Sequence, residues 1–462
     1  MHPALLPPSR PLHAAPLDPD FQPAALFNRQ YRAALAAAGN AVPLVLGLER
    51  ESGLRSRFET RIRPAADPDT LRYVERLVKS LLWARGGWKI QFGGPREIGE
   101  CLRTIYSRHG ARAFDADLME RVYERPLAIE LTTADAVPAA KELRTALGGH
   151  LEGCRIGFDL GASDYKVSAV QDGQVVYTEE FPWDPKNQAD PQYHYDHLQA
   201  GLQSAAAKLP RVDAIGGSSA GVIVNNRIMA ASLLRSVPAE KFDQARNLFL
   251  RLREQWGVPL EVLNDGDVTA LAGGLSLNVH GVLGVALGSS EAAGYLDRQG
   301  RLTGWLSELA FAPVDYCPTA PPDEWSGDRG VGALYFSQQA VNKLLPAAGI
   351  ALPAGMGLPD RLKQVQALMA KGDPRAVKVY ETIGVYLGYA VPHYAEFYEI
   401  DHLLILGRVT TGDGGNIVLA KAQAVLAEEF PDLAGHVQLH LPDEKSRRVG
   451  QAVAAASLPA LT

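Results

Sequence analysis

The segment Asp159-Leu-Gly-Ala-Ser-Asp-Tyr-Lys166 has the residue types of a phosphate-binding turn. An apolar strand ends on Asp159, and Gly161 lets the backbone approach a ligand closely, so that its N–H groups can hold phosphate oxygens. Ser163 can add a hydrogen-bond donor and Lys166 a positive charge. Asp159 cannot contact a phosphate favourably, but it can hold the accompanying Mg²⁺ through water. An ordinary hairpin turn is the alternative explanation of the same residues.

The segment Glu261-Val-Leu-Asn-Asp-Gly-Asp267 places acidic residues where a strand gives way to a helix. An acid at the carboxyl end of a buried strand lies where α/β folds bind their ligands. There Asp265, which follows Asn264, can accept the proton of a substrate hydroxyl during phosphoryl transfer. The alternative is that Asp265 only caps the helix, and Asp267 suits that capping role at least as well.

Two later segments carry residues that can contact a ligand. Glu308 lies among apolar residues, so it is either a surface charge or a buried acceptor for the hydroxyl groups of a ligand. Further along, an apolar strand enters the glycine-rich loop Gly407–Gly415, and a helix over 416–426 follows. A loop of this kind lets the backbone face a flat or phosphorylated ligand.

The elements around the first segment recur later in the chain. Three strands are predicted there, joined by tight turns, at residues 155–158, 165–171 and 174–178. The pattern returns 127 residues later without a gap, because Leu160–Ser163 aligns with Leu287–Ser290 and Gly173–Val175 aligns with Gly300–Leu302. The equal spacing of the two glycine turns predicts two copies of one α/β lobe.

The chain before the repeat is organised differently. Residues 1–23 contain seven prolines and are predicted to form a flexible arm. Residues 24–150 are predicted to form an α+β domain, whose elements are a hairpin at 42–48 and 54–62, a helix at 70–83, a strand at 88–92, a second helix around 98–105 and a last helix ending near Gly148–Gly149. Trp83, Trp88 and Phe92 are either its own core, which we favour, or part of an oligomer contact or a lid.

The composition limits the class of protein. A chain of 462 residues predicts two or three domains, and 47% hydrophobic and 21% charged residues are typical of a globular protein. The sequence shows no apolar run of membrane-spanning length and no apolar signal segment at its start, so we expect no membrane partner. Three distant cysteines (Cys101, Cys154 and Cys317) predict free thiols and a cytoplasmic location.

The charge distribution argues against a nucleic-acid partner. Residues 1–150 hold 21 of the 46 Lys and Arg residues and 17 of the 52 Asp and Glu residues, which leaves 25 basic and 35 acidic residues in the remainder. Acidic residues interrupt the arginines of the N-terminal part, as in Glu49-Arg50-Glu51. This pattern is typical of a solvated, ion-paired surface.

In their order along the chain, these segments resemble the ROK family (repressor, open reading frame, sugar kinase) of the sugar kinase/heat-shock/actin superfamily. The resemblance covers residues 153–458 and implies an α/β protein of two duplicated ribonuclease-H-like lobes, the actin-like ATPase fold, which close over ATP. The expected division is a flexible arm at 1–23, an N-terminal α+β domain at 24–150, a first lobe at 151–280, a second lobe at 281–445 and a C-terminal helix at 446–462 that returns to the first lobe.

The resemblance also implies a role for each motif. Asp265 is the base that activates a sugar hydroxyl, and Asn264 and Glu308 bind neighbouring hydroxyls. The remaining residues flank the sugar (Gly217, Ser218 and Ser219), form the first phosphate loop (Asp159, Gly161, Ser163 and Lys166), form the second phosphate loop (Gly288, Ser289 and Ser290) or hold the adenosine (Gly407 and Gly412). ATP and Mg²⁺ are the expected cosubstrate and cofactor, with Mg²⁺ held by Asp159 through water.

The sequence departs from the family pattern around the zinc site. Phe311 replaces the histidine that serves as the first zinc ligand, and Val331 occupies the place of the last zinc cysteine. Cys317 alone cannot rebuild a tetrahedral site, so we predict no zinc. The proline-rich stretch Cys317–Trp325 is instead predicted to be a loop rebuilt over the sugar pocket.

Two functions fit this pattern. The first is an ATP- and Mg²⁺-dependent sugar kinase with Asp265 as general base. The second is a ROK-like sugar sensor or regulator with weakened catalysis, because Glu291 follows Gly288-Ser-Ser where the second phosphate loop commonly has a glycine. Family repressors carry an N-terminal winged helix, whereas residues 24–150 show no helix-turn-helix pattern. We therefore expect a small-molecule sugar and no nucleic acid as partner, and we leave a homodimer open.

Overall fold

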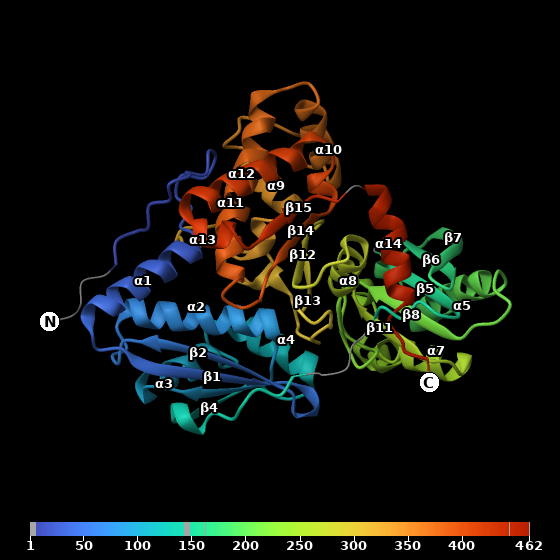
Figure 1. The fold of residues 1–462 in the computed structure, drawn as a ribbon, viewed down its shortest axis with the longest axis horizontal. Coiled ribbons are helices and arrows are strands. Elements are labelled where there is room, and N and C mark those ends of the chain that lie inside the picture. Colours follow the sequence, from blue (N-terminus) through green and yellow to red (C-terminus); the bar gives the residue numbers. More distant parts are fainter. Residues whose placement is uncertain (1–5, 143–147, 162, 443, 462) are drawn as a thin grey trace. The chain divides into compact units, whose positions relative to one another are not determined.

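A computed structural model of the chain describes residues 6–142, 148–161, 163–442 and 444–461. The chain forms two compact units. The larger unit comprises Met1–Leu143, Val285–Ala293 and Gly304–Leu441, and the smaller unit comprises Arg144–Gly284, Gly294–Thr303 and Pro442–Thr462. Figure 1 labels their helices and strands along the chain. No helix within the described ranges is both long enough and apolar enough to cross a membrane.

The smaller unit is built on a five-stranded sheet of order β11-β8-β5-β6-β7. Its strands are β5 (Cys154–Leu160), β6 (Asp164–Gln171), β7 (Gln174–Pro182), β8 (Ala214–Ser219) and β11 (Leu260–Asn264). The first three are antiparallel neighbours, and β8 and β11 run parallel to β5. The predicted hairpin turn at Asp172–Gly173 is confirmed, because both residues have positive φ (48° and 78°), as a tight two-residue turn requires.

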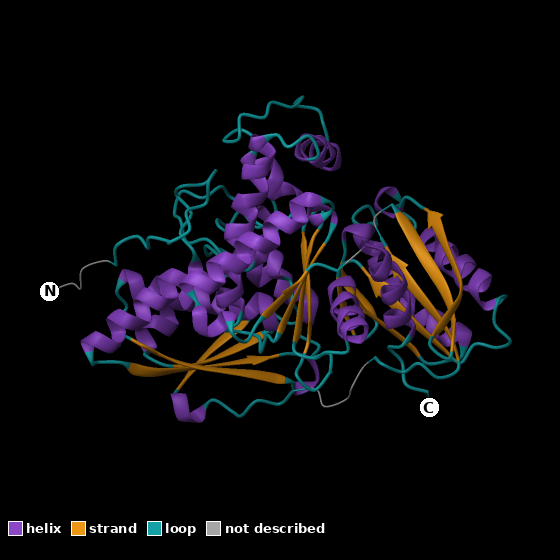
Figure 2. Ribbon diagram, turned by 45° about the horizontal axis from the view of Figure 1, so that its top comes forward, coloured by secondary structure: helices purple, strands orange, loops and turns teal. Residues whose placement is uncertain are grey.

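Helices cover both faces of this sheet (Figure 2). They are α14 (Glu444–Ala456) on one face and α5 (Pro191–Ala206) and α7 (Leu248–Trp256) on the other. Gly157 and Gly216, which are paired across β5 and β8, let the backbone of α14 lie directly on the sheet, since a Cβ at either position would collide with its carbonyl oxygens. The opposite face buries Phe158, Leu198 and Phe249 in one apolar core.

The second copy of the repeat forms part of a four-stranded sheet of order β13-β12-β14-β15. Its strands are β12 (Val282–Leu287), β13 (Glu291–Leu296), β14 (His402–Leu406) and β15 (Gln438–His440). The ends of β5 and β12 and the starts of β6 and β13 are each 127 residues apart, as the sequence predicted. The third strand of the repeat differs, because the described residues after Gly300 form only an isolated bridge, Leu296 to Leu302.

The N-terminal part of the larger unit contains both helices and strands, and it belongs to the same compact unit as 285–293 and 304–441. Its sheet has the order β2-β1-β3-β4. The strands are β1 (Val42–Glu49), β2 (Arg55–Ile62), β3 (Lys89–Gly93) and β4 (Ala128–Thr132), and the helices are α1 (Ala24–Ala38), α2 (Pro68–Arg85), α3 (Arg96–Ile105) and α4 (Ala113–Tyr123). The predicted last helix is wrong over its described part, because 139–142 is extended and Lys141 bridges to Arg55; its continuation at 143–147 lies outside the described residues.

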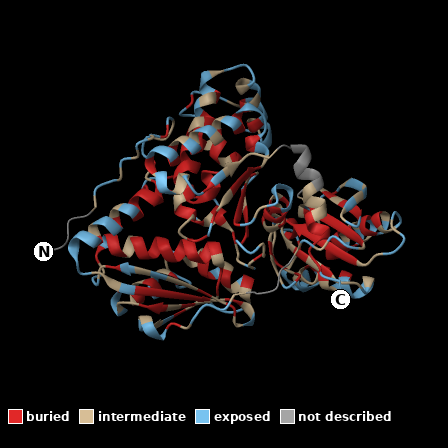
Figure 3. Ribbon diagram, viewed as in Figure 1, coloured by how far each residue is buried: buried red, intermediate tan, exposed pale blue. Residues whose placement is uncertain are grey.

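Helix α2 is buried along almost its whole length, as Figure 3 shows. Its N-cap is Asp67, whose side chain accepts hydrogen bonds from the N–H groups of Asp69 and Thr70. Pro68 occupies the first helical position, where the missing N–H of proline costs nothing. One side of α2 lies over the N-terminal sheet. The other contacts the second part of the larger unit, where Arg76 pairs with Asp328. This helix therefore joins the two parts of the larger unit.

The second part of the larger unit is mainly helical around its strands. Its helices are α9 (Gln338–Leu344), α10 (Leu358–Met369), α11 (Pro374–Tyr394), α12 (Asp413–Glu429) and α13 (Pro431–Ala434). The proline-rich segment that we expected to be a flexible arm runs along α11, where the N–H groups of His13 and Leu17 donate to the hydroxyls of Tyr389 and Thr382. Phe21 is buried beside Tyr386. The described part of the arm is thus anchored at several points.

Candidate functional site

Three parallel strands of the smaller unit end at the same level and bring the first candidate residues together. The sheet register aligns Asp159 of β5 with Ser218 of β8, and Ser219 with Asn264 of β11. The Oγ of Ser218 donates a hydrogen bond of 2.7 Å to Asp159 Oδ1, and both serines are fully buried. The carboxyl ends of these strands are the position where α/β sheets bind ligands.

The side chain of Asn264 caps helix α8 (Asp265–Leu277), and that of Asp265 shares the same backbone N–H. Asn264 Oδ1 accepts from the N–H of Gly266 at 2.7 Å, and its Nδ2 donates to the carbonyl of Gly221 at 2.8 Å. Asp265 Oδ1 accepts the same N–H of Gly266 at 3.0 Å, so the alternative of a capping role for Asp265 holds in part. Asp267 accepts from Tyr295 and does not cap the helix. Asn264 therefore keeps one N–H and one lone pair for a ligand.

Asp265 occupies the first position of α8, beside Asp159. Burial raises the pKa of Asp265 from its ordinary value to about 7, and the charge of Asp159 adds to the effect. Burial also raises the pKa of Asp159, which the hydrogen bond from Ser218 partly offsets. A carboxyl group with a pKa near 7 is present in both protonation states at neutral pH, which suits a general base.

The pKa of Asp267 is also shifted mainly by burial, but Asp267 has a different hydrogen-bond partner and a different neighbouring charge, that of Asp265. Burial raises the pKa of Asp267 to about 7 as well. Its Oδ1 accepts the backbone N–H of Tyr295 in β13 at 3.3 Å. The pKa values of Asp265 and Asp267 are similar and do not distinguish the two residues. Their contacts do, because the carboxylate of Asp267 accepts a hydrogen bond from the backbone of β13.

The first glycine turn leaves its serine and lysine close to acids. The N–H of Gly161 donates to the carbonyl of Asp164 at 3.0 Å, and the exposed Ser163 donates to the carboxylate of the same residue. Lys166 is paired with Asp159 in the strand register and lies 3.6 Å from both Asp164 and Glu180. A positive charge is thus present beside Asp159, shared between two carboxylates.

The second glycine turn is in the larger unit and exposes two hydroxyls. Ser289 and Ser290 are exposed between β12 and β13, and the carbonyl of Gly288 accepts the N–H of Gln338 at the start of α9, at 2.9 Å. The following residue, Glu291, is 3% exposed, and its Oε1 accepts from the hydroxyl of Tyr394 at 3.1 Å. The acid that the sequence placed at a phosphate-facing position is therefore buried in the unit.

Glu291 carries little charge at neutral pH. Burial raises its pKa to about 8, and the nearby carboxylate of Glu308 contributes to the shift. Its Oε2 packs against Gly332, where a Cβ would collide with it. Glu291 is accordingly a neutral, inward-facing group, which removes the repulsion of a phosphate that the sequence suggested.

The predicted adenosine loop begins beside the second phosphate loop. Gly407 follows β14 with φ of 96°, and a Cβ there would collide with the carbonyl of Leu287, the last residue of β12. Glycine is therefore needed at 407 for close packing of two strand ends. Gly412, with φ of 76°, lies just before α12 and has open space around it.

Glu308 lies in the larger unit, at the end of helix α2. It is half-buried, and its N–H donates to the carbonyl of Trp83 at 3.0 Å. Phe311, three residues later, packs against the rings of Trp83 and Phe114, with centroids 4.5 and 5.3 Å away. The sequence favoured Trp83 as a core residue of the N-terminal domain alone and carried no signal for this contact.

The positions of the absent zinc ligands are occupied by packing residues. Val331 is fully buried and bridges to Pro313, and the buried Cys317 has its Sγ 3.1 Å from the hydroxyl of Thr319. Among the described residues, no group of three or more His, Cys, Asp or Glu side chains is arranged to hold a metal ion. The absence of zinc stays a prediction.

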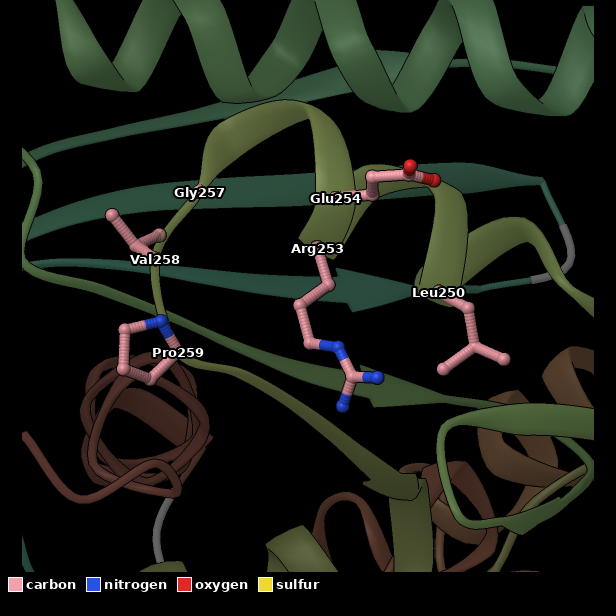
Figure 4. Close-up of a pocket in the computed structure, with 6 residues that line it drawn as sticks. All are labelled: Leu250, Arg253, Glu254, Gly257, Val258 and Pro259. Carbon is pink, nitrogen blue, oxygen red and sulfur yellow. The ribbon is translucent and has the colours of Figure 1, made fainter. Parts of the chain in front are cut away.

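A surface pocket of the smaller unit lies elsewhere. Figure 4 shows its lining residues, which come from the end of α7 and the segment that leads into β11: Leu250, Arg253, Glu254, Gly257, Val258 and Pro259. They precede β11, whereas Asn264 is the last residue of that strand and Asp265 follows it. The pocket is therefore separate from the cluster of Asp159 and Asp265.

Comparison with known proteins gives the fold. No protein-family model matches the sequence, and no curated protein matches it. A solved ROK family transcriptional regulator, described as a homologue of the E. coli MLC protein, matches with a TM-score of 0.54 and 20% identity over 67% of this chain and 79% of that chain. A ROK hexokinase from Thermus thermophilus matches with a TM-score of 0.51 and 16% identity over 65% of this chain and 97% of its own.

These matches confirm the predicted resemblance at the level of the fold. The actin-like ATPase fold of ROK structures extends over about two thirds of the chain, and about a third lies outside the match. A kinase and a regulator share this fold, so the fold by itself does not choose between the two functions.

Proposed function

We propose that the protein transfers the terminal phosphoryl group of ATP to a hydroxyl group of a sugar, with Asp265 as the general base. The observation that carries the proposal is the position of Asp265. It follows the carboxyl end of β11, in line with the ends of β5 and β8. The N-cap of α8 is Asn264, which accepts the N–H of Gly266 at 2.7 Å and shares it with Asp265 at 3.0 Å, so the helix start has a cap without Asp265.

The contacts of Asp265 and Asp159 suit different parts of phosphoryl transfer. Asp265 can take the proton of the acceptor hydroxyl, because its pKa of about 7 makes its carboxylate a stronger base than an ordinary aspartate and leaves part of it deprotonated at neutral pH. The charge of Asp159 raises the pKa of Asp265, and a cation beside Asp159 would reduce this repulsion. Asp159 would hold Mg²⁺ through water, and the ion would neutralise charge on the phosphates.

The other predicted residues would bind and orient the two substrates. Gly161, Ser163 and the turn Gly288–Ser290 would donate N–H and O–H groups to the phosphates, and the segment Gly407–Gly412 would face the adenosine. Glu308 would accept hydrogen bonds from sugar hydroxyls. Most of the acceleration would then come from alignment and charge stabilisation, as is usual in phosphoryl transfer.

A sugar-binding regulator is the second candidate. It is supported by the fold match to a ROK transcriptional regulator, which is as good as the match to the hexokinase. Under this alternative Glu308 and the strand ends would bind a sugar, but ATP would not be turned over.

The deciding experiment is a coupled ADP-release assay across hexoses, amino sugars and polyols. The kinase proposal expects sugar-dependent ADP release above the rate without sugar for at least one compound, and its loss in Asp265→Asn. Binding of a sugar with no ADP release from any compound would favour the regulator.

A further inference from the structure

We infer that the end of helix α2 in the N-terminal domain positions Glu308 for its ligand, with Trp83 as the main positioning residue. The inference rests on the proposed function, which assigns Glu308 to sugar hydroxyls. It gives the N-terminal domain a role in acceptor recognition without any contact of its own with the substrates.

The backbone around Glu308 is held by the last carbonyl groups of α2. Ser307 donates its N–H to the carbonyl of Ala84 at 2.9 Å, and Glu308 donates to that of Trp83 at 3.0 Å. Carbonyl groups in the last turn of a helix have no partner within the helix, so they are available for this contact. Two successive hydrogen bonds determine where the Glu308 side chain leaves the backbone.

The conformation of Ser307 indicates that this contact is imposed by its surroundings. Ser307 has φ of 50°, in the left-handed region that residues other than glycine seldom adopt. Such a conformation persists where neighbouring groups determine it. Here the hydroxyl of Tyr398 reaches both the carbonyl of Ala84 at 3.2 Å and the Oγ of Ser307 at 3.4 Å, and so links the helix end to the bend.

Aromatic packing holds the segment on the other side of Glu308. Trp83 is fully buried, and its ring lies 4.5 Å from Phe311, which also contacts Phe114 of α4. The indole N–H of Trp83 donates to Asp115, so the orientation of the ring is fixed as well as its position. Aromatic contacts of this kind resist sliding because their geometry is specific.

A buried ion cluster attaches α2 to the loop that follows Phe311. Asp328 in this loop lies 2.9 Å from Arg76, 3.3 Å from Lys79 and 2.6 Å from Arg112. Lys79 is fully buried and also pairs with Asp115 at 2.6 Å. Displacing α2 from this loop would leave buried charges unpaired, which is strongly unfavourable. Helix α2 therefore cannot shift without disturbing the Glu308 segment.

The test compares two variants that weaken this contact with one that does not. Trp83→Phe removes the hydrogen bond to Asp115 and part of the contact with the ring of Phe311. Phe311→Leu removes the same aromatic contact by changing its second partner. Trp88→Phe is the matched control, because it changes a half-buried tryptophan of the same domain whose N–H donates to Arg50. Phe311→Leu also decides the question if Trp83→Phe does not fold.

The first measurement needs no ligand. Hydrogen exchange in the full-length protein is expected to be at least tenfold faster at the amides of Ser307 and Glu308 in both variants, with no change in a peptide covering 259–268. The control is expected to match the wild type at both places. Exchange that is unchanged in both variants would overturn the inference.

The second measurement uses D-glucose and ADP as probes in binding titrations. Both variants are expected to weaken the Kd for D-glucose at least fivefold and to keep the Kd for ADP within twofold. Glu308→Gln serves as the reference. If this variant loses D-glucose affinity while Trp83→Phe and Phe311→Leu keep it, the positioning role fails and the proposed function stands. If Glu308→Gln binds D-glucose as the wild type does, the assigned role of Glu308 fails, and the inference fails with it.

Discussion

Replacing Asp265 by Asn separates catalysis from stability. The substitution keeps the size and shape of the side chain and removes the negative proton acceptor. General-base catalysis contributes a factor of about 10² to 10⁴, so kcat is expected to fall at least about a hundredfold. The affinity for nucleotide is expected to stay near that of the wild type, because Asp265 faces the acceptor in the proposed reaction.

The same substitution is expected to stabilise the fold above neutral pH. The folded pKa of Asp265 is raised from 3.8 to about 7, so the charged form is disfavoured in the folded state and stability is lost as the pH rises through this range. Three pKa units correspond to about 4 kcal/mol, and solvent screening of this half-buried side chain reduces the gain to about 1–2 kcal/mol. The Tm of the variant at pH 8 should rise by about 2–8 °C.

The assay is ADP release over a range of sugar concentrations, from well below KM to saturation, between pH 6 and 9, together with thermal unfolding at pH 8. Below pH 7 the wild-type kcat/KM should fall about tenfold per pH unit, because the base becomes protonated. Asp267→Asn is the control, since its pKa is raised equally but its carboxylate bonds to the backbone of Tyr295. It should stabilise the protein similarly and keep kcat within a few-fold. Turnover of Asp265→Asn within a few-fold of wild type would refute the assignment.

Three further predictions follow from other parts of the structure. Glu291→Gln should leave the nucleotide affinity unchanged and should raise the Tm at pH 7 and somewhat more at pH 9, with little effect near pH 4, because burial raises the pKa of Glu291 from 4.5 to about 8 and stability is lost as the pH rises through this range; a loss of stability at pH 7 and pH 9 would contradict this. Elemental analysis should find no stoichiometric zinc, since Phe311 packs against the ring of Trp83 and Val331 is buried, and neither side chain can bind a metal ion. Mobility-shift assays at physiological salt should show no sequence-selective DNA binding, because acids interrupt the basic residues.

The sequence alone determined the elements whose signals are local. The strands β5, β6 and β7 and the turn at Asp172–Gly173 follow from alternation and from a turn pair that tolerates positive φ. The hairpin of β1 and β2 and the helix α2 were found for the same reason. The third strand of the second repeat was predicted wrongly. The repeat places it after Gly300, but the described residues there form only one bridge, because strand formation depends on distant neighbours that the sequence does not reveal.

The roles of neighbouring polar residues were decided by tertiary contacts. Asn and Asp cap helices about equally well, so the sequence could not choose between Asn264 and Asp265. The fold brings the carbonyl of Gly221 to position 264, and only an amide can donate to it while also capping. Similarly, the fold places Glu291, at the start of β13, beside the buried hydroxyl of Tyr394, where burial raises its pKa to about 8.

The partner of a buried side chain also depends on tertiary structure. The helical spacing of α2 shows that Trp83 faces inward, since apolar residues on one stripe must leave water. It does not show what lies opposite, because the contact with Phe311 joins residues 228 positions apart. The sequence therefore determined the motifs and the local elements that carry Asp159, Asp265 and Glu308. Only long-range packing decided which side chains these residues meet and how strongly burial shifts their charge.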